Sequence, residues 1–257
     1  DNRNQPRKIN IDTAIANPAN GVFPYYTKEE HVSVAKISPC RVIELIKSIG
    51  GGVYGSTMKD TTSQYLPPNH ESAITPNPDY NSLWVGDGEF LKERMVRFSY
   101  RFKFDDGEYS TIAPFTQICF VPQQDGYFTK VGDIKDQDRT FTSTEVQFMR
   151  NKITQIALQI PAPYVGLLGT ALWSDMYDRL KIVEVDILYK ESNGLAVKVV
   201  DTITRAQWES TVTGYFEYVY NSQKPFKVLP EKELVRISDV VPIRALGQEI
   251  SGNRVIY

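Results

Sequence analysis

The chain has 257 residues, of which 41% are hydrophobic, and its formal net charge is -2. A chain of this length can form two small domains or one large all-β domain with a buried core. The near-neutral charge argues against a polybasic surface for nucleic acid or membranes, and no apolar run approaches the ~18 residues of a membrane span. The 15 tyrosines and 12 phenylalanines favour β-strands.

Little regular structure is predicted for the N-terminal part of the chain, residues 1–36. Asparagine, glutamine and Pro6 oppose it until Lys8–Ile11, which can form a short strand. The chain begins at Asp1 rather than Met and ends at Tyr257 inside an apolar run. We interpret it as a fragment of a longer polypeptide.

Residues 32–50 allow two interpretations. Ser38 as N-cap, Pro39 at the first helical position and Gly50 after the end would frame a short helix. The valine-containing stretches, including Val42–Ile46, fit strands of a sandwich instead. The β character of the rest of the chain favours strands.

The strongest pattern in the chain runs from Met95 to Val121. In Val96–Phe104 apolar residues at even positions alternate with arginine, serine and lysine at odd positions. This is the period of two expected of a strand with one apolar and one polar face. Asp105–Glu108 then predicts a turn, because Gly107 can adopt a positive φ.

The return from this turn is interrupted by Pro114. We expect return strands on either side of it, at Tyr109–Ile112 and Thr116–Val121. Proline has no N–H to donate to a neighbouring strand. Pro114 therefore predicts the edge of a sheet, a bulge or a change of sheet, and never the middle of a sheet.

The second half of the chain predicts further short strands, after a polar connection at 122–141. Alternation and turn residues predict strands at Ile153–Ile160, Val183–Tyr189, Leu195–Ile203, Tyr215–Tyr220, Arg236–Val241 and Ile250–Tyr257, and helices at Thr142–Lys152, with a capping box, and Leu167–Leu180. Many short strands favour sandwiches over a sheet of βαβ units. The two halves are similar to two related sandwiches in tandem, without a fixed repeat period.

Residue patterns for catalysis or metal binding are weak. His31 and His70 lie far apart in polar surroundings without a metal-binding spacing, and fit exposed loop positions. The glycine-rich Gly50–Thr57 has no lysine before its Ser/Thr, so it fits a flexible loop better than a phosphate-binding loop. It opens a long loop predicted for residues 50–80. We assign no catalytic, cofactor-binding or metal-binding residue, and expect a non-enzymatic protein.

Carboxylates gather at two places. Asp105, Asp106 and Glu108 lie at the predicted turn, while Glu184 and Asp186 alternate on one predicted strand, which puts both on the same, solvated face. A glycosidase needs two carboxylates about 5–10 Å apart across a cleft. Because any exposed sheet provides that spacing, a hydrolase is a minor alternative.

Aromatic residues leave glycan binding as the second hypothesis. Core packing and oligomer contacts account for such residues equally well. The candidate stacking platforms are Tyr25, Tyr26, Trp84, Trp173, Trp208 and the run Tyr215–Tyr220.

The chain has two cysteines, Cys40 and Cys119. We interpret them as two small buried apolar residues rather than as a disulfide. A single disulfide across domain edges remains an alternative. Domains of this size do not need a disulfide framework.

Several segments resemble parts of known virion proteins. VRFSYRFKFDDGEYSTIAPFTQICFVP resembles a fibronectin type III-like unit of virion structural proteins of tailed bacteriophages, most closely those of crAss-like phages. IVEVDILYKESNGLAVKVVDTI is similar to the corresponding strand pair of a second unit. VPIRALGQEISGNRVIY resembles a strand that returns into a β-propeller-like region of phage tail nozzle proteins, and DNRNQPRKINID is similar to the strand that leaves it.

The resemblance covers most of the chain, and is weakest at 37–80 and 205–235. It implies an all-β fold of tandem immunoglobulin/fibronectin III-like sandwiches with flanking propeller-like strands and one or two short helices. The implied units are an N-terminal extended segment at 1–36, a first sandwich at 37–125, a second sandwich at 141–235 and a returning strand at 236–257.

The implied function is that of a structural component of a virion, in the muzzle or nozzle of the phage tail. It would assemble with copies of itself into a ring-shaped homo-oligomer and would also contact other tail proteins. Such a part needs rigid units rather than a catalytic cleft, and packed antiparallel sheets supply them. No cofactor, nucleic-acid-specific site or membrane span is expected. The alternative is a receptor- or glycan-binding sandwich of the virion or of a bacterial cell surface.

Overall fold

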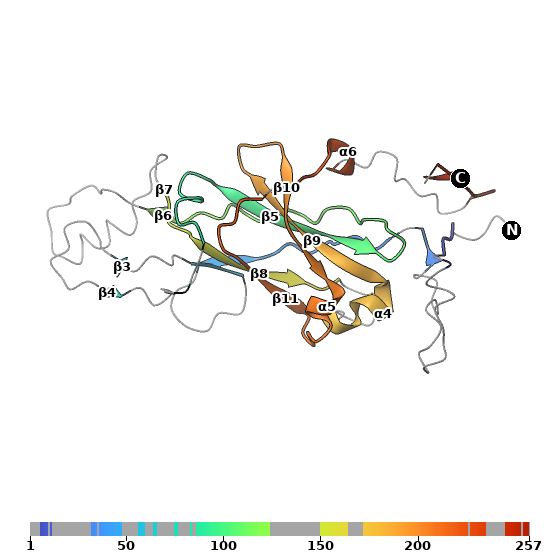
Figure 1. The fold of residues 1–257 in the computed structure, drawn as a ribbon, viewed down its shortest axis with the longest axis horizontal. Helices are drawn as coiled ribbons and strands as arrows, with labels where there is room; N and C mark the ends of the chain where they lie inside the picture. The colour runs from blue at the N-terminus through green and yellow to red at the C-terminus, as the bar shows by residue number, and fades with distance from the viewer. Residues whose placement is uncertain are drawn as a thin grey trace.

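Two four-stranded sheets packed face to face form the centre of the molecule in a computed structural model (Figure 1). The structure describes residues 6–9, 11, 32–34, 36–47, 56–59, 64–65, 75–76, 83, 86–123, 150–163, 172–225, 227–234, 245–252 and 254–256, and the statements below concern these. The predicted all-β class is confirmed for this part of the chain.

The first sheet has the order β1-β2-β8-β11 and the second the order β12-β10-β9-β5. Only β1 and β2 pair in parallel; the other neighbours in both sheets are antiparallel. The strands of the first sheet are β1 (Leu45–Lys47), β2 (Ser56–Lys59), β8 (Gln155–Pro161) and β11 (Tyr215–Tyr220). Those of the second are β5 (Val96–Phe104), β9 (Ile182–Glu191), β10 (Val197–Thr204) and β12 (Lys227–Val228).

Smaller elements surround the two sheets. Three two-stranded sheets pair β3 (Gln64–Tyr65) with β4 (Thr75–Pro76), β6 (Pro122–Gln123) with β7 (Arg150–Asn151), and β13 (Glu249–Ser251) with β14 (Arg254–Ile256). The helical turns are η3 (Trp173–Asp175), α4 (Met176–Leu180), α5 (Arg205–Trp208) and α6 (Glu231–Leu234).

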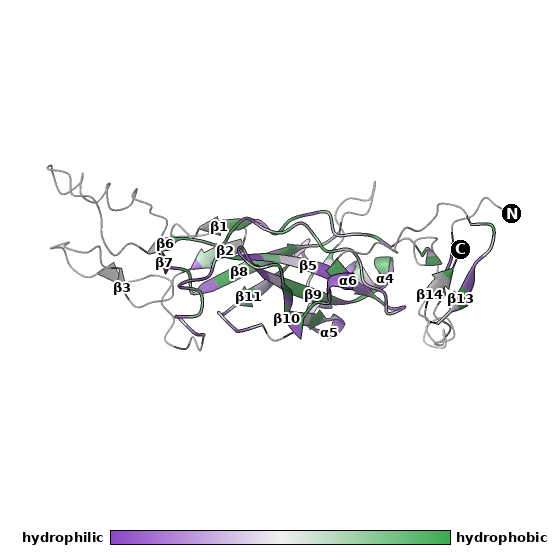
Figure 2. Cartoon of the chain, turned by 90° about the horizontal axis from the view of Figure 1, so that it is seen from above, coloured by the Kyte–Doolittle hydropathy of each residue, from purple (hydrophilic) through white to green (hydrophobic). Residues whose placement is uncertain are grey.

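The core follows from the alternation in the strands. On β8 the residues Ile156, Leu158 and Ile160 are fully buried, and the residues that alternate with them, Gln155, Ala157 and Gln159, are half-buried. Hydrophobic and hydrophilic segments alternate along the strands of both sheets (Figure 2). The ring of Phe98 on β5 lies 5.1 Å from that of Tyr220 on β11, so aromatic contacts join the two sheets.

Both sheets combine strands from the two halves of the chain. β5, within 37–125, pairs along its whole length with β9, within 141–235, and β2 pairs with β8. Most of the buried hydrophobic residues of both ranges belong to one core cluster. The two four-stranded sheets thus share one core, and the expected tandem arrangement is not confirmed. Alternation identifies strands but not their partners.

The segment after the acidic turn differs from the two expected return strands. Between 109 and 121 only single bridges form, from Tyr109 to Lys103 and from Cys119 to Val96. Pro114 is exposed, belongs to no strand and lies in the segment beside β5, the last strand of its sheet. The prediction of an edge position for Pro114 is confirmed.

The predicted helices agree with the structure only in part. The helix framed by Ser38 and Gly50 is wrong over 36–47, where the structure has β1 and no helix. The helix at Thr142–Lys152 is wrong at its end, where Arg150–Asn151 is β7. The helix at Leu167–Leu180 is confirmed in its second half by η3 and α4.

Residues 124–149, 164–171 and 235–244 lie outside the described part, and with them the predicted strand at Arg236–Val241. The region from Ile250 onward forms the hairpin β13–β14 instead of one strand.

Candidate functional site

The outer face of the second sheet, away from the shared core, carries the polar residues of β5. The alternation predicted a polar face, and on it Ser99 and Arg101 are 0% and 1% exposed. A second apolar cluster covers this face. Its members are Leu188, Val197, Val199 and Leu229, with Ile112, Phe115 and Leu234 packed against them. The edge segment after β5 and the β12–α6 region thus cover part of the outer face, including Ser99 and Arg101.

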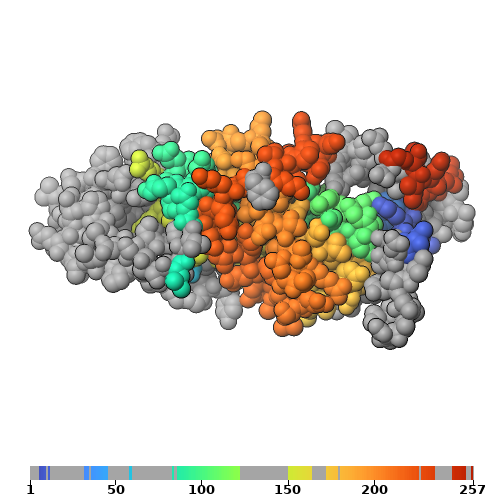
Figure 3. All heavy atoms as spheres, in the orientation of Figure 1, coloured from blue at the N-terminus to red at the C-terminus, as the bar shows by residue number. Residues whose placement is uncertain are grey.

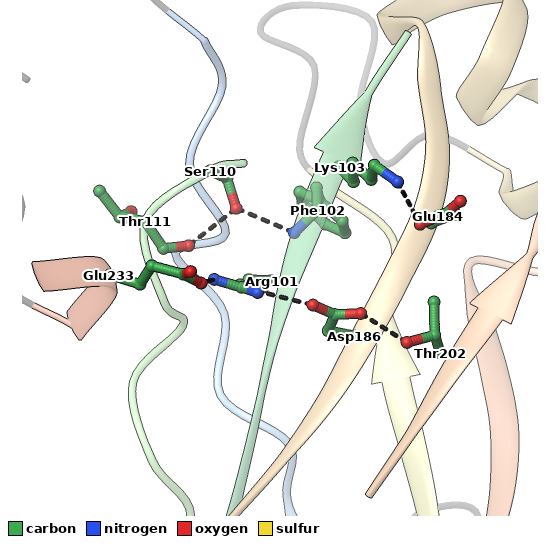
Figure 4. Close-up of polar contacts among 9 residues, drawn as sticks. All are labelled: Arg101, Phe102, Lys103, Ser110, Thr111, Glu184, Asp186, Thr202 and Glu233. Carbon is green, nitrogen blue, oxygen red and sulfur yellow. Dashed lines mark hydrogen bonds and ion pairs between the residues drawn. The ribbon is translucent and has the colours of Figure 1, made fainter. Parts of the chain in front are cut away.

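Arg101 is the centre of a buried charged row on this face (Figure 4). Its Nε donates to Oδ2 of Asp186 at 2.9 Å, and its Nη1 donates to Oε2 of Glu233 at 2.9 Å. Thr202 Oγ1 donates to the other Asp186 oxygen at 2.7 Å. The ring of Tyr109 lies 3.9 Å from the Arg101 Cζ.

The register of the sheet produces this row. Arg101 and Asp186 are direct cross-strand partners on β5 and β9, and Asp186 is in turn the partner of Thr202 on β10. Opposite residues of neighbouring strands point to the same face, so three strands meet in one polar line. Glu233 extends the line to α6. The contacts join four elements.

The carboxylates predicted on β9 do lie on one face, but they are not both solvated. Asp186 is 2% exposed and its partner is Arg101. Glu184 is half-buried and pairs with Lys103 at 2.8 Å; the hydrogen bond to Glu184 raises the pKa of Lys103. Each carboxylate is therefore bound by its own cation, which is the arrangement of a cross-strand ion-pair ladder.

The acidic turn binds lysines of the N-terminal region. Gly107 has a φ of +82°, as predicted for this turn. Asp106 pairs with Lys36 at 2.8 Å, both side chains being nearly buried, and Glu108 pairs with Lys8 at 2.7 Å. The turn thereby attaches the N-terminal segment to the end of β5.

Hydroxyl groups complete the edge of β5. Ser110 N–H donates to the Phe102 carbonyl, and its Oγ accepts from the Phe102 N–H at 2.9 Å. Thr116 repeats the same pair of bonds with Phe98. The buried residues 110, 113, 116 and 119 recur every third position and face β5 residues two apart. This bulged segment covers an edge strand that would otherwise present unpaired backbone groups.

Buried Asn151 joins its own segment to two others, at Arg94 and at Cys119–Val121. Its Nδ2 donates to the Cys119 and Arg94 carbonyls at 3.0 and 3.3 Å. Its Oδ1 accepts from the backbone N–H groups of Val121 and Ile153. Sequence reasoning missed this residue, because one asparagine beside a strand carries no pattern of its own.

Of the aromatic residues proposed as glycan platforms, those that the structure describes are buried or half-buried. Trp173 and Trp208 are both 0% exposed and pack against each other at 5.7 Å, so their role as stacking platforms is wrong. Tyr220 is also buried, while Tyr215 is half-buried. Tyr25, Tyr26 and Trp84 lie outside the described residues.

The other residues singled out in the sequence form no common site. Cys40 is exposed and Cys119 buried, and both are free thiols; burial raises the pKa of Cys119. Of Gly50–Thr57 the structure describes Ser56 and Thr57, which start β2.

His31 and His70 fall outside the described residues. Within the part that is described, no group of three His, Cys, Asp or Glu side chains is arranged to hold a metal ion, and no helix is long and apolar enough to cross a bilayer.

Comparison with protein-family models, with curated proteins and with solved structures finds no match for this chain.

Proposed function

We propose that this chain is a structural component of a bacteriophage virion, in the muzzle or nozzle of the tail, which acts through protein–protein contacts and not through catalysis. The observation that carries the proposal is that charged groups on the second sheet pair with one another within the protein. Arg101 and Asp186 neutralise each other inside the protein, and the partly exposed Glu233 binds the same guanidinium. These groups hold strands together, which suits a mechanical part.

Rigidity supports the same role. The second sheet is covered on both faces, by the shared core on one side and by the smaller apolar cluster on the other. The free edge of β5 is closed by backbone and hydroxyl hydrogen bonds. A sheet that is buried on one face, partly covered on the other and protected at an edge resists local opening and unwanted pairing.

Contacts between the flanking segments support an insertion in a larger β structure. The Arg7 N–H donates to Gln248 Oε1 at 3.1 Å, and Gln248 Nε2 donates to the Arg7 carbonyl at 2.7 Å. The segments coloured blue and red meet at one end of the molecule (Figure 3). Under the proposal, 1–36 and 236–257 leave and re-enter a propeller-like region, with a fibronectin III-like sandwich between them.

The assembly state of the purified chain tests this proposal. Under the proposal, negative-stain microscopy and light scattering show a homo-oligomer, ring-shaped in the full-length protein, and polysaccharide substrates stay intact. Turnover of any bacterial polysaccharide that is lost on substitution of Glu184 or Asp186 would overturn it.

The glycan-binding alternative loses its main support, because Trp173 and Trp208 are inaccessible. No observation on the described residues favours it over assembly.

A further inference from the structure

The outer face of the second sheet carries one charged row that lacks an opposite charge. Arg97 on β5 is the direct cross-strand partner of Lys190 on β9, which places their Cβ atoms about 5 Å apart. The other two cations of β5 on this face are matched by carboxylates of β9, Arg101 by Asp186 and Lys103 by Glu184. Of these three cross-strand rows, only the row of Arg97 and Lys190 brings two like charges opposite each other.

The row also holds an unused hydrogen-bond donor. The Nε of Arg97 is buried and has no hydrogen-bond partner among the described residues. No ion pair within that part of the chain involves Arg97 or Lys190. The contact found for Lys190 is to the ring of Phe115, 5.8 Å from its Nζ. Like charges on opposite strands and an unsatisfied buried donor both destabilise the fold.

We propose that Arg97 and Lys190 bind a carboxylate of an acidic segment of a partner protein. A carboxylate accepts hydrogen bonds from a guanidinium at fixed geometry and neutralises an adjacent ammonium. It removes the repulsion between the two cations across the row. Arg97, Lys190 and Phe115 form what we call the cation pair site.

Apolar surface next to the site selects a polypeptide over a free anion. Phe115 packs on the apolar cluster of this face. Val197 is the β10 partner of Lys190, and Leu195, two residues before it, is 90% exposed at the turn between β9 and β10. An acidic side chain beside an apolar one, as in a protein segment, matches both features.

The site extends the proposed assembly role and rests on it for the kind of partner. Its test is nevertheless separate from the test of that role. Failure of the peptide experiment below would remove this surface and leave the oligomer measurement unaffected.

The test uses the full 257-residue chain and a fluorescent hexaglutamate peptide in low-salt buffer, with hexaglutamine as the neutral peptide. We expect hexaglutamate to bind and hexaglutamine not to bind. Arg97→Gln and Lys190→Gln should each weaken binding by about tenfold or more. Lys227→Gln, an exposed lysine on β12 of the same sheet, should leave the affinity within about twofold.

A second measurement, the Tm without peptide, still tests the proposal if the Arg97→Gln variant does not fold. Without peptide, Lys190→Gln should raise the Tm, because it removes the like-charge contact, whereas Lys227→Gln should not. Absence of hexaglutamate binding, equal binding by all three variants, or equal binding of hexaglutamine would overturn the proposal. Complete displacement by equimolar inorganic phosphate would overturn the assignment to a polypeptide carboxylate.

Discussion

Arg101 and Asp186, on the neighbouring strands β5 and β9, form an ion pair of 2.9 Å in which the side chains are 1% and 2% exposed. Asp186→Ala should lower the free energy of unfolding by about 3–5 kcal/mol, because it leaves a buried guanidinium with one partly exposed partner, Glu233. Urea denaturation monitored by tryptophan fluorescence measures the change.

The neighbouring row provides the matched control. Lys103 and Glu184 are also cross-strand partners, but their side chains are 29% and 31% exposed. Glu184→Ala should therefore cost no more than about 1 kcal/mol. Equal losses for Asp186→Ala and Glu184→Ala would show that the burial of the Arg101 row does not matter to stability.

A second prediction concerns the hydroxyl groups at the edge of β5. Thr116→Val keeps the shape of the side chain but leaves the Phe98 N–H without its 3.0 Å acceptor. We expect a loss of about 1–3 kcal/mol, and a faster amide hydrogen exchange at Phe98. The exposed Thr111→Val on the same segment should change neither quantity. Unchanged exchange at Phe98 would contradict the assigned hydrogen bond.

Truncation of Trp208 separates core packing from ligand stacking. Trp208 packs on Trp173 at a ring distance of 5.7 Å, and Trp173 Nε1 donates to the Ile160 carbonyl. Trp208→Ala should cost about 3–5 kcal/mol, as other large core truncations do. Thermal unfolding measures this. A variant of unchanged stability that loses binding on a glycan array would instead restore the glycan hypothesis.

Alkaline pH should destabilise the fold. Burial raises the pKa of Tyr100, Tyr220 and Cys119 above the ordinary values of 10.0 for tyrosine and 9.0 for cysteine. Above about pH 9 the unfolded chain therefore binds fewer protons than the folded one, and the free energy of unfolding falls as pH rises. Below that pH the contribution is fully present.

The expected slope is up to about 1.4 kcal/mol per pH unit for each group within this window. Urea midpoints between about pH 8 and pH 10.5 measure it. Tyr220→Phe removes one titrating group, so its slope should be shallower than that of the unchanged chain. An identical slope for the two proteins would contradict the pKa assignment of Tyr220.

The strands with clear alternation could be predicted from the sequence. The region of β9 and the bounds of β11 were found because one face of each lies in the core, which fixes a period of two. The pairing of β5 with β9 could not be predicted, because alternation contains no information about partners far along the chain.

The candidate site was less predictable than the fold. The pattern placed Arg101 and Asp186 on polar faces of their strands, and that much is confirmed. Their burial depends on apolar residues from distant segments, such as Phe115 and Leu234, which cover the outer face. Ser110 and Thr116 likewise have a role only because the segment runs beside β5. Such coverage arises from tertiary packing, which a local pattern does not contain.

If a bacteriophage encodes this chain, as we propose, mass spectrometry of its purified particles is the decisive measurement. The account predicts that peptides from across the 257 residues are present in intact virions, in amounts similar to those of other tail proteins. Their presence in the infected-cell lysate, together with their absence from the particles, would contradict it.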